Sequence, residues 1–154
     1  MPASELSAAE RRVRGALLAF GLLDVVALLA VLMPRSLMDL VHQSSGLGPL
    51  PEGPIVGYLA RTSSLLYGVH GAVILFVATD VRRYAPLVRF LARLAVVQGV
   101  TILAIDWFEQ LPGWWQAIEG VCLIGIGIGV MAVQKQSERR PESVKEPAAV
   151  RRMS

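Results

Sequence analysis

The sequence has few of the residues that carry most redox, metal and nucleophilic chemistry. Its 154 residues include one cysteine, Cys122, and two histidines, His42 and His70. A single thiol cannot close an internal disulfide, and no C-x-x-C is present, which argues against thiol-redox chemistry through an internal pair. The sequence also has no zinc signature, no phosphate-binding glycine loop and no nucleophile with a paired base. We therefore expect no cofactor and no metal, and a function that is not enzymatic.

Charge is the second scarce property, because four internal blocks carry almost none. Apolar residues make up 54% of the chain and the mean hydropathy is +0.54, whereas soluble domains have about 45–50% apolar residues. The charged residues gather at the two ends and in the loops. This distribution is typical of a membrane protein with several spans and argues strongly against a soluble enzyme.

Four segments are long enough to cross a ~30 Å hydrocarbon layer, which takes about 20 apolar residues. The first continues a helix that starts at a capping box, Ser7-Ala-Ala-Glu10, and it stops at Pro34. Its apolar run exceeds the ~7–15 residues of a signal peptide and no cleavage site follows, so we interpret it as retained. The predicted spans are residues 16–33, 55–78, 87–105 and 114–133.

The predicted fold is therefore all-α, an integral membrane bundle of four transmembrane helices within residues 1–133. The connection between the first two spans contains PRSLMDLVHQ, whose spaced apolar residues indicate a short interfacial helix. Residues 134–154 are charged and interrupted by proline, which predicts a disordered tail. Gly125-x-x-x-Gly129 in the fourth span would permit close approach of another helix.

The basic residues predict the orientation of the bundle. Of fifteen Lys and Arg, all except Arg35 and Arg61 lie at the chain ends or around the loop between the second and third spans. The positive-inside rule then places both termini in the cytoplasm, as an even number of spans also requires. Basic residues placed beside spans also argue against a nucleic-acid partner. Three tryptophans, Trp107, Trp114 and Trp115, mark the opposite membrane boundary as interfacial anchors.

Several polar side chains lie inside the spans, where a charge costs a few kcal/mol and usually faces protein or water. On a helical wheel, the second span has one polar, small face and one apolar face. Depth predicts that Arg61 pairs with Glu119 or Asp106, and that Asp24 and His70 form a mid-membrane cluster near Tyr67. The candidate polar cluster comprises Asp24, Arg61, Tyr67, His70, Gln98, Asp106 and Glu119.

Two readings of this cluster remain open at the level of sequence. In the first, the polar contacts only join the helices and fix their register. In the second, they form a small-molecule or proton site, since a buried acid beside a histidine titrates near neutrality. Haem is a poorer fit because His42 lies outside the spans, and His70 with Asp24 supplies too few ligands for a metal.

The stretches GPIVGYLARTSSLLYGVHGAVILFVATDVRRYAPLVRFLA and IDWFEQLPGWWQAIEG resemble a group of small, uncharacterised bacterial membrane proteins with four spans. They resemble the DoxX-like and BphX-like families more remotely. The resemblance covers residues 12–133 and implies a bundle in the bacterial inner membrane, with no established activity. Some DoxX-like proteins are linked to quinone or sulfur redox systems, but the single cysteine does not fit a thiol-based version. It rests on Tyr58, Arg61, Tyr67, His70, Asp80, Arg82, Arg83, Tyr84, Asp106, Trp115, Glu119 and Gly120.

These features predict an integral inner-membrane protein that acts as a non-enzymatic subunit or accessory factor. Its expected partners are the lipid bilayer and either a second copy or another membrane protein. The basic Arg82-Arg83 loop and tail offer contacts to anionic lipid. The alternative is a small-molecule, quinone or proton-handling protein that uses the polar face of the second span.

Overall fold

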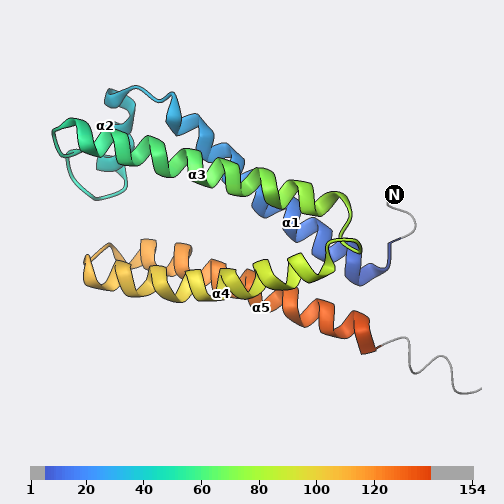
Figure 1. Ribbon diagram of the computed structural model, residues 1–154. Helices are drawn as coiled ribbons and strands as arrows, with labels where there is room; N and C mark the ends of the chain where they lie inside the picture. Colours follow the sequence, from blue (N-terminus) through green and yellow to red (C-terminus); the bar gives the residue numbers. More distant parts are fainter. Residues whose placement is uncertain (1–5, 140–154) are drawn as a thin grey trace, which may run out of the picture.

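A computed structural model describes residues 6–139 of the chain, with side chains described as far as residue 136. In this part of the chain the regular elements are helices and no strand occurs, which confirms the predicted fold class. Figure 1 shows them as long, nearly parallel rods with one short helix at a turn. The elements are α1 (Ala8–Val26), the 3-10 helix η2 (Ala27–Val31), α2 (Arg35–Ser44), α3 (Pro54–Thr79), α4 (Ala85–Phe108) and α5 (Gly113–Arg139).

Four of these helical segments are long and apolar enough to span a membrane, as the sequence predicts. Each is longer than its predicted span at one end or both. The first begins at Ala8 because the capping box forms: Glu10 N donates to Ser7 Oγ (3.2 Å), and Ser7 N donates to the Glu10 carboxylate (2.6 Å). The four candidate spans are Ala8–Val31, Pro54–Thr79, Ala85–Phe108 and Gly113–Gln136.

The C-terminal tail starts later than the sequence predicts. Residues 134–139, expected to be disordered, continue α5 to Arg139. Gln, Lys, Glu and Arg are good helix formers, so a charged sequence extends an existing helix without a large cost. The remaining predicted tail, residues 140–154, lies outside the described residues.

The helices associate as two antiparallel pairs. One pair joins α1 and η2 to α3, the other joins α4 to α5, and α1 links the pairs through its contacts with α5. Figure 1 shows the pairs close together where α1 begins and α5 ends, and apart near α2 and the α4–α5 turn. At the close end, a core of small aliphatic side chains fills the space between them, with Val77 and Val88 fully buried.

Glycine allows the backbones of each pair to approach closely. A Cβ on Gly71 of α3 would lie 2.6 Å from the carbonyl oxygen of Gly21 in α1, and one on Gly99 of α4 would lie 2.7 Å from that of Gly120 in α5. The expected close approach at Gly125 and Gly129 is wrong, since a Cβ on either would meet nothing within 4 Å. The contacts that depend on glycine lie elsewhere because α5 turns a different face to α4.

Gly71→Ala should destabilise the protein, because the added methyl group collides with α1 backbone and with Asp24. Overpacking of this kind costs about 1–3 kcal/mol. Gly125→Ala is the matched control, and it should be neutral or stabilising because alanine is the better helix former. Thermal unfolding of the two variants in detergent measures the difference. Equal midpoints would contradict the close α1–α3 contact.

The loop after α2 is held by hydrogen bonds to α2 itself. The predicted short helix is confirmed, and its Asp39 carboxylate accepts Leu50 N at 2.7 Å and Gln43 Nε2 at 2.8 Å. Arg35 donates to the carbonyls of Pro51 (2.7 Å) and Gly53 (3.0 Å). The backbone bond from Leu50, followed by that from Gln43, lowers the pKa of Asp39 below its ordinary value.

The pKa of Asp39 is lower in the folded protein than in an unfolded chain. Its hydrogen bonds should therefore be fully present at any pH above the ordinary aspartate pKa, and be lost as the pH falls through the lowered pKa. The amide chemical shift of Leu50 should report this titration in a pH series by NMR. We expect a midpoint below the ordinary value of about 3.9. In Asp39→Asn the shift should not titrate over that range. A midpoint at or above 3.9 would contradict the assignment.

Candidate functional site

A cavity of about 380 Å³ lies between the two helix pairs, in the half of the bundle where the pairs diverge. Its wall is mostly apolar and includes Phe20 and Leu23 from α1 and Ile118 from α5. The polar residues of the candidate cluster come to the cavity from all four long helices. Five of the seven line it: Asp24, Tyr67, His70, Gln98 and Glu119.

The predicted pairing of Asp24 with His70 is confirmed. Asp24 is 7% exposed, and its Oδ2 lies 2.7 Å from His70 Nδ1. At this distance Nδ1 and the carboxylate share one hydrogen bond, and Nε2 is left as the second polar atom of the ring. Phe20 packs edge-on against the imidazole, with ring centroids 6.2 Å apart. In residues 6–139, His70 Nε2 has no hydrogen-bond partner, and the ring lines the cavity.

A second polar group connects α3 to α5 across the cavity. Glu119 Oε2 accepts Trp115 Nε1 at 2.6 Å, and Oε1 accepts the Tyr67 hydroxyl at 3.3 Å. The sequence predicts Trp115 as an interfacial anchor. Its N–H also donates a hydrogen bond inside the protein. Trp107 and Trp114 are exposed, at 73% and 49%. The four-residue spacing of Trp115 and Glu119 on one helix face is the sequence signal for this contact.

Gln98 brings an amide to the cavity from α4. The side chain is half-buried and lines the apolar space beside His70. No hydrogen bond from its amide is present in the described part of the chain. An amide has two donors and an acceptor with two lone pairs, so Gln98 can hydrogen-bond to a molecule in the cavity.

Arg61 does not pair with Glu119 or Asp106, and this prediction is wrong. Its guanidinium donates to the carbonyls of Val31 (3.0 Å) and Met33 (3.0 Å), and to that of Gly57 (3.4 Å). The last carbonyls of a helix lack intrahelical partners. Arg61 satisfies those at the end of η2, since α3 packs on α1 and η2 and not on the helix that carries Asp106. Carbonyl oxygens also accept hydrogen bonds from a guanidinium, so a carboxylate at a similar depth in another span does not by itself identify the partner of Arg61.

Asp106 also lies away from the cavity. It is 3% exposed at the end of α4, and its Oδ2 has no hydrogen-bond partner among the described residues. Gln116 Nε2 donates to the backbone carbonyls of Leu111 (2.9 Å) and, at 3.5 Å, of Asp106 itself. Asp106 therefore belongs to the α4–α5 turn and is not a cavity residue.

Cys122 also lines the cavity, and the sequence did not indicate a functional role for it. It is the sole cysteine of the chain, is exposed, and lines the space between Glu119 and Ile126 on α5. Within residues 6–139, no group of three or more His, Cys, Asp or Glu side chains is placed to hold a metal ion. The groups available in the cavity are hydrogen-bonding side chains and one exposed thiol.

In comparisons with known proteins, the chain matches no family model, no curated protein and no solved structure. The resemblance to DoxX-like proteins therefore stays a prediction.

Asp24 and His70 should be energetically coupled. Asp24→Ala and His70→Ala should each destabilise the protein, and the double variant should be no less stable than the worse single variant. Polar contacts between membrane helices average ~0.6 kcal/mol and reach ~1.7 kcal/mol, and the short, buried geometry favours the upper end. A double-mutant cycle on unfolding free energies measures the coupling. Strictly additive losses would show that the two side chains act independently.

Proposed function

We propose that the chain is a non-enzymatic membrane protein that binds a small, largely apolar molecule with one hydrogen-bonding group. The observation that carries this proposal is an apolar cavity with two unpaired polar groups, the Gln98 amide and the second ring nitrogen of His70. Cavities of about 300–1,000 Å³ with apolar walls and a few polar groups are typical of small-molecule sites.

The paired groups indicate which kind of ligand fits. With Nδ1 held by Asp24, His70 leaves Nε2 for one hydrogen bond to a ligand. Glu119 already accepts two hydrogen bonds. The cavity is lined by the carboxyl groups of Asp24 and Glu119 and by the Gln98 amide, so it favours a ligand with a hydroxyl group, such as an alcohol or a phenol, over an anion. Its small size excludes a whole lipid.

A proton path through the bundle is less well supported. Counted from the open end of the cavity, Asp24 and His70 are the deepest titratable residues that line it. Toward the N-terminal end of α1, a void of about 40 Å³ follows, lined mainly by apolar side chains that include the fully buried Val88. Beyond it lies the aliphatic core. This closed half supports a binding cavity with one open end.

The setting we propose is a bacterial inner membrane with both termini in the cytoplasm. The positive-inside rule supports this orientation, since most basic residues lie at one end of the bundle. The open half of the cavity would then belong to the outer leaflet. A role as a subunit or accessory factor is compatible with such a site, because binding requires no catalytic group.

The sole thiol provides a direct test. N-ethylmaleimide should label Cys122 in the purified protein, and 1-naphthol should slow the labelling at lower concentration than naphthalene, which has the same apolar body without the hydroxyl. One neutral hydrogen bond is worth about 1 kcal/mol, so we expect roughly fivefold tighter apparent binding of naphthol.

Gln98→Leu should reduce this preference. Thr101→Val is the matched control on the same helix, because Thr101 is exposed and its hydroxyl donates to its own helix at Val97 O (2.9 Å). Equal protection by the two aromatics, or none by either, would contradict the proposed binding site.

A further inference from the structure

The cavity of the proposed site continues into a smaller space. This side void is the space of about 40 Å³ that lies between the helix pairs and is lined by Ile74, Val88 and Ala95, among others. Side chains from all four long helices surround it. The two spaces share a set of lining residues, so they adjoin each other. This shared boundary, the neck, consists of Phe20, His70, Gln98, Leu123 and Ile126.

The polar groups of the side void are confined to the neck. His70 and Gln98 line it, and its other lining residues are apolar side chains and one glycine. A hydroxyl group that reaches the Gln98 amide or His70 Nε2 from the larger cavity therefore lies at the entrance to the side void. A hydroxyl both donates and accepts, so it suits the amide and either tautomer of the imidazole.

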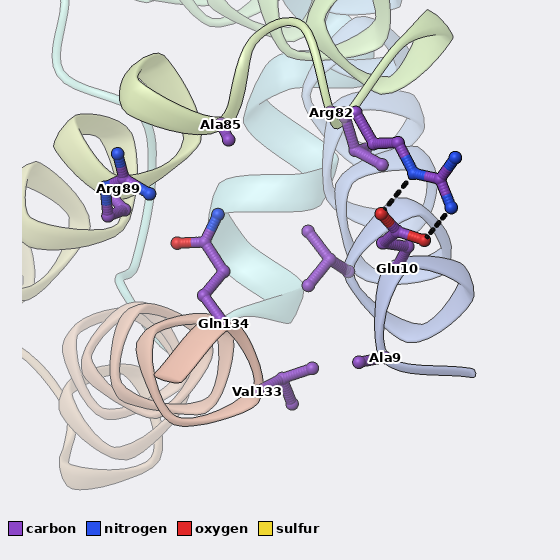
Figure 2. Close-up of a pocket in the computed structure, with 9 residues that line it drawn as sticks. Ala9, Glu10, Arg82, Ala85, Arg89, Val133 and Gln134 are labelled. Atoms are coloured by element: carbon purple, nitrogen blue, oxygen red, sulfur yellow. Dashed lines mark hydrogen bonds and ion pairs between the residues drawn. The ribbon is translucent and has the colours of Figure 1, made fainter. Parts of the chain in front are cut away.

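The side void limits what can enter it. A water-sized group needs about 10–15 Å³ of such space, so the void has room for roughly three groups of that size. It is closed by the fully buried Val88 and the aliphatic core. Figure 2 shows a separate cavity of about 220 Å³ at the far end of the bundle, where Arg82 is paired with Glu10. Within residues 6–139, the two spaces share no lining residue, so the side void does not lead into that cavity.

The larger cavity favours an aromatic body for the ligand. Phe20, Tyr67, Trp114 and Trp115 all line it. Aromatic rings that pack offset or edge to face attract one another by more than their buried area accounts for. A phenol therefore suits this wall better than an aliphatic alcohol of the same size.

We infer that the ligand is a phenol with a short alkyl group, about three carbons long, at the position next to its hydroxyl. The ring occupies the larger cavity, the hydroxyl bonds to His70 or Gln98 at the neck, and the alkyl group fills the side void. The inference rests on the proposed function and adds the position of the substituent. A para substituent points away from the hydroxyl, so it stays in the larger cavity.

The test compares 2-propylphenol with 4-propylphenol as protectants of Cys122 against N-ethylmaleimide, in the purified whole chain. The isomers have the same ring, hydroxyl and alkyl group, so they differ only in where the chain points. 2-Propylphenol should slow the labelling at about tenfold lower concentration. Each fully buried methylene contributes about fourfold in affinity, and the para chain keeps part of that burial in the larger cavity.

Ala95→Leu should remove the preference, because the larger side chain fills the side void from α4. Protection by 4-propylphenol should be unchanged. Ala104→Leu is the matched control, since Ala104 is exposed on the same helix and lines neither space. It should keep the tenfold preference. If Ala95→Leu does not fold, Leu91→Ala enlarges the side void and should shift the preference from 2-propylphenol to 2-pentylphenol.

The outcomes separate this inference from the proposed function. If 1-naphthol protects Cys122 but the two propylphenols protect equally, the side void is not used and the inference is overturned, whereas the proposed site stands. A preference that persists in Ala95→Leu overturns it as well. If neither 1-naphthol nor either propylphenol slows the labelling, the proposed site itself is refuted, and this inference with it.

Discussion

The half of the bundle that holds the larger cavity depends on the contact between Asp24 and His70. It joins α1 to α3 at mid-membrane depth, where an unpaired carboxylate would be costly. It can form only because Gly21 and Gly71 bring the two backbones together at the same level. A close backbone contact and a short polar contact thus support each other. Once both exist, the imidazole has one fixed face, and that face lines the cavity.

Two kinds of packing divide the molecule along its length. Where α1 begins and α3 ends, aliphatic side chains fill the space between the helix pairs. Beyond His70, aromatic and polar side chains keep the pairs apart and leave the larger cavity. Protein interiors normally reach crystal-like packing density, so a space of this size between helices is a feature that requires an explanation. The polar groups that line this space are the basis for proposing that it binds a small molecule.

The sequence was sufficient for the fold class, the four spans, the capping box and the Asp24–His70 pair, because each depends on local pattern or depth. It was insufficient for the environment of Arg61. Depth predicts that side chain level with Glu119, but packing between distant segments decides which helices touch. The partners that packing brings to Arg61 are backbone carbonyl oxygens. The sequence identifies Gln98 only as a polar residue inside a span. That it lines a cavity depends on how the two helix pairs are arranged, which the sequence pattern does not give.

The hydrogen bonds of Arg61 have a mechanical consequence. By donating to the carbonyls of Val31, the last residue of η2, and of Met33 just beyond it, this side chain fastens α3 to the end of the first span. That pair should therefore move as one rigid body. The α4–α5 pair is joined along its own length by close backbone contact. A rotation of one pair against the other would then turn about the valine-rich end, where the two pairs are in contact. Such a rotation would have to break the hydrogen bond from Tyr67 to Glu119, which joins the two pairs across the cavity.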